Sequence, residues 1–261
     1  MSKDPSLIQF NNQLAENIFS QYLKEINNAT VCFFYDEGNK QIQGGCGVFV
    51  KSDDKYYILS AAHVLAEQID NKYIILKDKE LFIGGNIFSS TMPPTNNRED
   101  DLIDVSIIQL DIDSARYLLT RFNPISKDKL GFKHDIKNST TYLISGYPKT
   151  KSKSNAKSKI IQSKIFSYRT KPNFDFDFTK SGFDYQKTIA VSFDGHITSK
   201  SNPHKHKAPN VDGISGSGLW YIDIEMNQMF LVGIVIQYIK ERPNKAILAT
   251  RIDYVFIEEL F

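Results

Sequence analysis

The pattern of short β-rich runs is the feature of this sequence that most limits its fold. From Ala29 onward, runs rich in Val, Ile, Phe and Tyr alternate with turn residues such as Glu37-Gly-Asn39 and Ser52-Asp-Asp54. They fall into two sets on either side of an expected linker at 111–137. The first set comprises 30–35, 47–50, 55–59, 72–76 and 105–110, and the second comprises 141–144, 160–168, 188–193, 218–223, 229–237 and 246–250. Many short strands separated by turns are typical of a barrel or a sandwich.

An amphipathic helix is expected before the β-rich part. Apolar residues recur there every three to four positions, behind Asp4 as an N-cap and Pro5 at a first helical position. They are Leu7, Phe10, Leu14, Ile18, Tyr22 and Ile26. The spacing predicts a helix of about 20 residues whose stripe packs on its own domain, with a partner-docking surface as the alternative. A short helix over 252–260 is expected to close the chain.

Charge and cysteine content exclude several classes of protein. The 261 residues hold 32 Lys plus Arg against 30 Asp plus Glu, and the resulting net charge of +2 is too small to favour nucleic acid or an anionic membrane as a partner. Two cysteines cannot form a secreted disulfide framework or a four-cysteine zinc site. The longest apolar run, 230–236, is far shorter than the about 20 residues of a spanning helix. With no signal-peptide pattern either, we expect a cytoplasmic protein without metal or cofactor.

Three short segments carry side chains suited to catalysis. His63 follows a run of small residues at the end of a predicted strand. Asp101 and Asp104 precede a buried apolar run, and Ser215 lies in a glycine-rich turn. Taken singly, each feature is more often structural, as a hydrogen-bonded histidine, a turn cap or a loop serine.

Together and in this order, the three segments resemble the chymotrypsin-like (trypsin-like) serine proteases, whose catalytic residues run His, Asp, Ser along the chain. The resemblance covers about residues 30 to 255. It implies an all-β fold of two antiparallel β-barrels, here with an N-terminal amphipathic helix and a short C-terminal helix. The expected domains are the helix at 1–28, a first barrel at 29–125 with His63 and Asp104, and a second barrel at 126–261 with Ser215.

The resemblance gives the histidine and one aspartate defined roles. His63 would act as general base and then general acid, because a neutral imidazole titrates near neutrality. Asp104 would accept a hydrogen bond from the other ring nitrogen of His63 and stabilise the imidazolium. Asp104 is preferred to Asp101 because it directly precedes the buried run, as the family's aspartate does.

The serine turn supplies the expected nucleophile. The family pattern Gly-x-Ser-Gly selects Ser215, while Ser217 falls where a second small residue is usual and remains the competitor. The resemblance also places the amides of Gly213 and Ser215 in one oxyanion hole. The interval from Asp104 to Ser215 looks long for the family, and the polar stretch 149–210 can hold the excess as surface loops.

Two departures from secreted members of the family concern disulfides and activation. Secreted members have a cysteine after the histidine, paired with an upstream one; here Val64 follows His63, although Cys46 holds the upstream place. Cys32 and Cys46 are expected to be buried free thiols, with a disulfide across a hairpin as the alternative. Ile214 replaces the aspartate that pairs with a newly cut N-terminus, so activation by N-terminal cleavage is not expected.

The specificity pocket also departs from that of trypsin. Pro209 stands where trypsin has its aspartate, so cleavage after Lys or Arg is not expected. The resemblance makes Gln237, Tyr238 and Ala246 the substrate-binding residues. Because Tyr238 stands where a glycine usually opens the pocket, we expect a narrow one.

The sequence therefore predicts a serine endopeptidase that cleaves a protein or peptide substrate and is regulated by a partner protein or by loop ordering. It resembles the narrow-specificity processing enzymes of the bacterial cytoplasm. The alternative is a catalytically latent protease-fold module that acts by contact. A nucleic-acid adaptor working through the lysine run 149–159 is a third hypothesis, although such runs are usually solvated loops. His204 and His206 lack further ligands and are expected to be loop residues.

Overall fold

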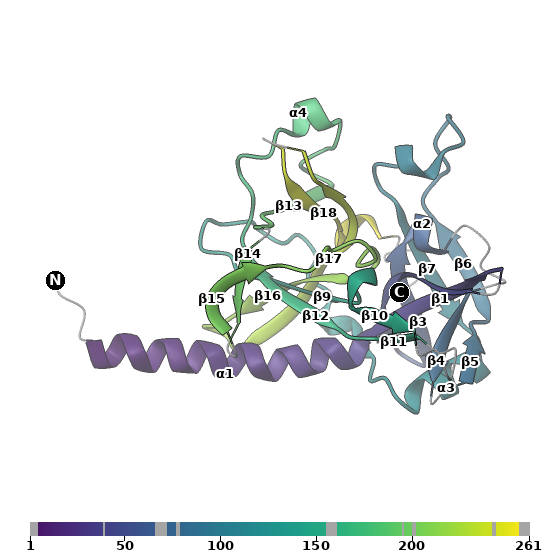
Figure 1. The fold of residues 1–261 in the computed structure, drawn as a ribbon, viewed down its shortest axis with the longest axis horizontal. Helices are drawn as coiled ribbons and strands as arrows, with labels where there is room; N and C mark the ends of the chain where they lie inside the picture. Colours follow the sequence, from purple (N-terminus) through teal and green to yellow (C-terminus); the bar gives the residue numbers. More distant parts are fainter. Residues whose placement is uncertain are drawn as a thin grey trace.

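The chain folds into two antiparallel β-sheets with one long helix at its N-terminal end (Figure 1). The structure is a computed structural model that describes residues 5–38, 40–65, 72–76, 79–154, 161–194, 196–199, 202–241 and 244–255. The mostly β architecture predicted from the short runs is confirmed. Within the described residues, no helix is both long and apolar enough to cross a membrane.

The first sheet has the strand order β5-β4-β1-β2-β3-β7-β6, with β8 added in parallel to β2. Its strands are β1 (Thr30–Glu37), β2 (Lys40–Ser52), β3 (Lys55–Ala61), β4 (Tyr73–Leu76), β5 (Lys79–Phe82), β6 (Gly85–Ser89), β7 (Val105–Leu110) and β8 (Ile125–Ser126). In the described part of the chain no strand pairing joins β5 to β6, so this curved sheet is open at its edges.

The second sheet has the order β12-β9-β16-β17-β18-β13. Its strands are β9 (Tyr142–Gly146), β12 (Phe166–Thr170), β13 (Thr188–Val191), β16 (Gly218–Asp223), β17 (Gln228–Ile239) and β18 (Ala246–Arg251). A bridge between Pro172 and Val191 brings the two edges together. Two hairpins extend from this half of the chain: β10 (Ser152–Ser154) with β11 (Ile161–Ser163), and β14 (His196–Ser199) with β15 (Asn202–Lys207).

The N-terminal helix α1 (Pro5–Ala29) confirms the predicted amphipathic helix and is longer than expected. Figure 1 shows it running alongside the second sheet, with its N-terminal end projecting past the strands. Ile18, Tyr22 and Ile26 are buried, as the apolar stripe predicts. An ion pair of 2.8 Å between Glu16 and Arg169 of β12 ties the helix to the second sheet. The described part of the stripe therefore packs against the protein itself.

Short helices occupy several connections that were expected to be loops. The stretch 111–137 contains α3 (Ile112–Leu119), which begins where the Asp111 carboxylate accepts a hydrogen bond from the Ser114 amide at 2.7 Å. The other short helices are α2 (Ala62–Leu65), α4 (Phe178–Ser181) and the 3₁₀ turns η2 (Arg98–Asp100), η3 (Lys127–Lys129), η4 (Lys149–Lys151) and η5 (Ile252–Tyr254). The C-terminal helix expected at 252–260 is described only as η5, because 256–261 lie outside the described residues.

One apolar cluster runs through both sheets and fixes their relative position. It includes Ile58 of β3 together with Trp220 of β16 and Ile234 of β17, all of them fully or almost fully buried. Packing of this kind resists relative movement, since protein interiors are filled about as densely as organic crystals. Side chains that meet between the sheets are therefore held on a rigid frame.

Candidate active site

The pairing of β3 with β7 brings His63 and Asp104 together. Ala61, the last residue of β3, is the register partner of Val105, the first residue of β7. One step further out, the Ala62 amide donates to the Asp104 carbonyl at 2.9 Å. Because the two strands run in opposite directions, the residue that follows Ala62 and the residue that precedes Val105 meet at the same edge.

Asp104 is held by two hydrogen bonds from His63. Its Oδ1 accepts from the His63 backbone amide at 2.8 Å, and its Oδ2 lies 2.5 Å from His63 Nδ1. Burial raises the pKa of the Asp104 carboxyl above its ordinary value, although the hydrogen bonds and charge of His63 oppose that shift. Nδ1 is thus committed to Asp104, while the imidazole is 37% exposed and makes no other hydrogen bond within the described chain.

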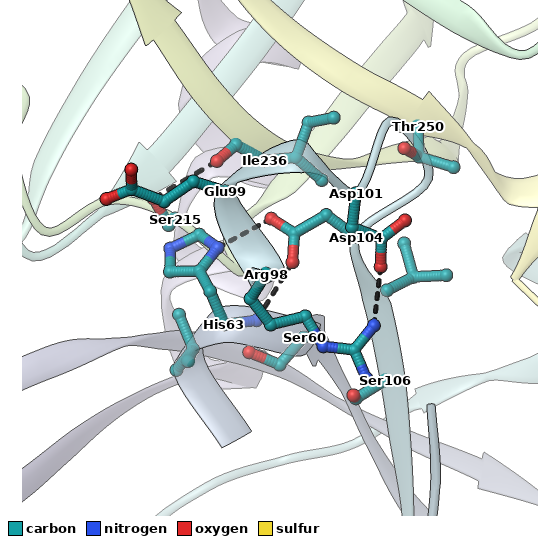
Figure 2. A network of polar contacts seen from close by, with 12 residues as sticks. Ser60, His63, Arg98, Glu99, Asp101, Asp104, Ser106, Ser215, Ile236 and Thr250 are labelled. Atoms are coloured by element: carbon teal, nitrogen blue, oxygen red, sulfur yellow. Dashed lines mark hydrogen bonds and ion pairs between the residues drawn. The ribbon is translucent and has the colours of Figure 1, made fainter. Parts of the chain in front are cut away.

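Asp101 has a different role from Asp104. Its carboxylate pairs with the Arg98 guanidinium at 2.6 Å and accepts a hydrogen bond from Ser90. Burial opposes its ionisation, but the hydrogen bonds from Ser90, from two backbone amides and from Arg98 lower the pKa of Asp101 below its ordinary value. Figure 2 shows this pair beside Asp104 and His63. The Asp101–Arg98 pair therefore braces the loop of residues 97–101, which lies over the candidate site.

The turn that carries Ser215 is anchored to both sheets. The Cys46 amide of β2 donates to the Ser215 carbonyl at 2.8 Å, and the Gly216 amide donates to the Val235 carbonyl of β17 at 2.7 Å. Gly216 has a positive φ of 84° and lies against the Cys46 carbonyl so closely that any Cβ would collide with it. The glycine after Ser215 is therefore required by the close approach of two backbones.

The two candidate serines lie in different environments. Ser215 is half-buried on the cavity wall, and its hydroxyl donates to the Ile236 carbonyl at 3.4 Å, a long bond. Ser217 is fully buried, and its Oγ has no hydrogen-bond partner among the residues that the structure describes. Figure 2 shows the His63 imidazole between Ser215 and Asp104, although Ser215 makes no hydrogen bond to His63 in the described chain. Of the two hydroxyls, only that of Ser215 faces a space that a substrate can enter.

The backbone around Gly213 leaves two amides unused. The Asp212 carbonyl accepts from the Lys149 amide at 2.8 Å, and the Ile214 amide donates to the Val211 carbonyl. Among the described residues, the amides of Gly213 and Ser215 donate to no protein acceptor. Unpaired amides at a turn suit the binding of a developing negative charge. These are the two amides that the sequence assigned to an oxyanion hole, an assignment that stays a prediction.

A cavity of about 690 Å³ contains these groups. Its lining includes His63, Asp104 and Ser215, the predicted pocket residues Gln237 and Tyr238, and several residues of the 97–101 loop. The third predicted pocket residue does not line it: Ala246 is fully buried in β18 as the register partner of Ile239. The cavity therefore brings together the proposed triad and two of the three expected substrate-binding residues.

Sequence reasoning missed the acidic part of this lining. Glu99 and Asp100 are exposed on the 97–101 loop and take part in no ion pair within the described chain, whereas Asp212 pairs with Lys240 at 3.1 Å. Carboxylates concentrated in a cleft focus a negative potential there. The acidic composition of this loop was a visible signal, but only the structure shows that the loop covers the cavity. The exposed carboxylates of Glu99 and Asp100 therefore make this side of the cavity acidic.

The residue opposite Val64 is Gly45, which corrects the placement of Cys46. A Cβ built on Gly45 would lie 2.5 Å from one methyl of Val64 and 2.8 Å from the other. Side chains alternate along a strand, so Cys46 points to the other face, where its thiol contacts the Gly213 carbonyl at 3.4 Å. Val64 thus packs into the space above a glycine, and Cys46 does not hold the upstream position of the lost disulfide.

The contact between Gly45 and Val64 predicts a strong coupling between two substitutions. Gly45→Ala should lower the free energy of unfolding by about 1–3 kcal/mol, because the added methyl collides with Val64. Val64→Ala should also destabilise the protein, by leaving a cavity. The double variant should be more stable than the sum of the two effects allows, because the second change removes the colliding methyls. Urea denaturation of all four proteins measures this, and simple additivity would contradict it.

The two cysteines are directly opposite each other in the first sheet. Cys32 of β1 is the register partner of Cys46 of β2, and both thiols are free and buried, as expected. Burial raises the pKa of the Cys46 thiol to about 12, and burial likewise raises the pKa of the Cys32 thiol. Both groups are therefore protonated and poorly nucleophilic at neutral pH.

The weaker sequence signals are only partly covered by the structure. The lysine run 149–159 begins at η4 beside the Gly213 turn and continues into β10, but 155–160 lie outside the described residues. His204 and His206 fall in β15, and their side chains also lie outside the description. Within the described residues no group of acidic, histidine or cysteine side chains is arranged to hold a metal ion.

Comparisons with known proteins support the fold. No family model matches the chain, and no curated protein matches it in sequence. Among solved structures, the chain is similar to an inactivated protease paralogue of the scabies mite, with a TM-score of 0.56 and 16% identity over 90% of this chain and 93% of that one. A likeness at this identity concerns the fold alone. The all-β, chymotrypsin-like fold expected from the motifs is confirmed.

Proposed function

We propose that this protein is a serine endopeptidase that cleaves a protein or peptide substrate through an acyl-enzyme intermediate. The observation that carries the proposal is the hydrogen bond between His63 Nδ1 and the buried carboxylate of Asp104, in the same cavity as Ser215. This contact leaves Nε2 as the basic nitrogen of a neutral imidazole. A nucleophile, a base and a carboxylate that orients the base are the groups that acyl transfer requires.

The proposed reaction follows from these positions. The Ser215 hydroxyl turns from the Ile236 carbonyl toward His63, and its oxygen attacks the substrate carbonyl carbon while its proton passes to Nε2. The Gly213 and Ser215 amides would donate to the oxyanion that forms. Nε2 then gives its proton to the departing amine as the C–N bond breaks, which leaves an ester on Ser215. Water activated by His63 hydrolyses that ester and restores the serine.

We also propose that the enzyme has a narrow specificity and is regulated by a partner or by loop ordering. Ile214 is buried in an apolar cluster of the second sheet, which supports control that does not depend on a charged new N-terminus. The free thiols of Cys32 and Cys46 suit a reducing compartment such as the cytoplasm. Residues of loop 97–101 form part of the cavity lining, which supports selection among substrates.

Labelling with a fluorophosphonate tests the nucleophile. The wild-type protein should incorporate one label per chain, since such reagents phosphonylate a serine only when a neighbouring base activates it. Ser215→Ala should abolish labelling, whereas the matched change Ser217→Ala should preserve it, because the Ser217 hydroxyl is fully buried. Intact-protein mass spectrometry gives the stoichiometry. Labelling that survives Ser215→Ala but disappears in Ser217→Ala would assign the nucleophile to Ser217.

A latent protease-fold module is the second candidate function. It is favoured by the present orientation of the Ser215 hydroxyl, which bonds to Ile236 rather than to His63. The similar scabies mite structure is also described as an inactivated paralogue. This function is supported if the purified wild-type protein neither reacts with the fluorophosphonate nor cleaves any member of a broad peptide library, even after candidate partners are added.

A further inference from the structure

Gln43 is a buried polar side chain that the proposed reaction does not use, and it lies directly behind the Gly213 turn. It belongs to β2 and is 3% exposed. Glutamine is seldom buried unless its amide is fully paired, because an unpaired donor or acceptor in the interior costs about 1–3 kcal/mol. The partners of Gln43 therefore show which parts of the protein its amide connects.

The Gln43 amide uses both donors and both acceptor positions. Nε2 donates to the Tyr147 carbonyl and, at 3.4 Å, to the Gly213 carbonyl. Oε1 accepts from the Ser152 hydroxyl and, at 3.4 Å, from the Ser163 hydroxyl. Because a carbonyl can only accept, the NH₂ group must face Tyr147 and Gly213, and this fixes the orientation of the amide.

One end of this amide restrains the conformation of Gly213. Gly213 has a φ of 95°, and a glycine can adopt both positive and negative φ values. The orientation of its peptide groups therefore depends on the hydrogen bonds that they make with other residues. Its carbonyl accepts from Gln43 and from the Cys46 thiol, while the preceding carbonyl of Asp212 accepts from the Lys149 amide. With both carbonyls bonded to the protein, the Gly213 amide, like that of Ser215, is left available to a substrate.

The other end of the amide contacts the base of a hairpin. Ser152 of β10 and Ser163 of β11 are register partners, and their hydroxyl oxygens are 2.7 Å apart. Both hydroxyls meet the same Gln43 oxygen. A single side chain thus connects the hairpin that interrupts the lysine run to the turn that precedes Ser215.

We propose that Gln43 is a positioning residue that couples the β10–β11 hairpin to the Gly213 peptide and keeps the oxyanion hole in shape. The inference rests on the proposed function, because it needs a reaction in which an oxyanion develops. In this role Gln43 acts through its hydrogen bond to the Gly213 carbonyl and makes no contact with substrate.

The test replaces Gln43 by methionine, which keeps the length of the side chain and removes all of its hydrogen bonds. In Gln43→Met, kcat should fall by about 10- to 100-fold with KM nearly unchanged, because the misplaced amide matters in the transition state. The affinity for a peptide boronic acid, whose tetrahedral adduct carries the negative charge, should fall in parallel. Amide hydrogen exchange of the segment 211–217 should accelerate. The matched control, Thr170→Val, removes a buried hydroxyl bond to Ser192 and should change none of these.

A second, milder variant keeps the test decisive if Gln43→Met does not fold. Ser152→Ala removes one donor to the Gln43 oxygen without changing β2, and it should shift kcat and the exchange of 211–217 in the same direction by a smaller factor. Wild-type kcat in Gln43→Met, or unchanged exchange of 211–217, overturns the inference. If the wild-type protein itself neither labels nor cleaves, the proposed function fails, and the exchange measurement alone decides whether Gln43 holds the turn.

Discussion

Replacing Ser215 or His63 by alanine is expected to lower kcat by about 10⁶, and the double variant is expected to be no worse than either single one. In the proposed mechanism each substitution removes the same event, the transfer of a proton from Ser215 Oγ to His63 Nε2 during attack. Once one partner is gone, the other has nothing to act on. The residual rate should come from the free amides at Gly213 and from substrate binding.

Single-turnover kinetics on a cleavable peptide provide the measurement, with Ser217→Ala as the control. That control keeps the triad and should retain kcat within about tenfold of the wild-type value. Additive losses, with the double variant far below both single variants, would show that Ser215 and His63 do not act as a unit. A wild-type rate in His63→Ala would remove the histidine from the mechanism.

Asp104→Asn should separate catalysis from stability. We expect kcat to fall by about 10⁴, because an asparagine amide donates to His63 Nδ1 and forces the tautomer in which Nε2 carries the proton. The fold should persist, because the asparagine oxygen can still accept from the His63 amide, whose bond to the carboxylate is 2.8 Å. The residual activity and circular dichroism of the variant measure the two effects.

The stability of Asp104→Asn should depend on pH in a defined direction. The folded-state pKa of Asp104 is raised by burial, so above about pH 3.9 the unfolded chain loses this proton before the folded one does. The contribution of Asp104 to the free energy of unfolding of the wild-type protein therefore falls as pH rises above about 3.9. It is restored at lower pH, where the carboxyl is protonated in both states. Relative to wild type, the variant should gain stability from pH 3 to pH 7 in urea titrations. A relative loss over that range would contradict the raised pKa.

The sequence was sufficient to predict the elements that periodicity and strand composition mark strongly. The N-terminal helix and most of the longer strands were expected within a few residues of their observed bounds, but β2 begins at Lys40, seven residues before the run predicted at 47–50. The short strands β5, β6, β8 and β10 were missed, because their stability comes from neighbouring strands rather than from their own residues. The helix α3 was also missed, although Asp111 is a good N-cap residue, because the segment was read as a linker.

In the candidate site, too, local sequence patterns predicted some features, whereas others depend on contacts between distant parts of the chain. The structure places Asp104, and not Asp101, against His63, because the buried strand after Asp104 sets the pairing with β3. From the sequence, Cys46 was expected at the position opposite Val64, but Gly45, one residue earlier, occupies it. Without the strand register, a sequence does not show which of two neighbours faces Val64. Glu99 and Gln43 were not found, because only the folded chain brings a distant loop and strand to Ser215.

The division of the proposed catalytic groups between two sheets has a consequence for the newly synthesised chain. His63 and Asp104 lie at the ends of strands β3 and β7 of the first sheet, which ends at Ser126, whereas Ser215 belongs to a turn that the Cys46 amide holds in place. As the chain leaves the ribosome, the first sheet can form while no nucleophile is present. Hydrolytic capacity would then arise only when synthesis is nearly complete and the second sheet has docked. Under the proposed function, a nascent or truncated chain without the second sheet would lack its nucleophile.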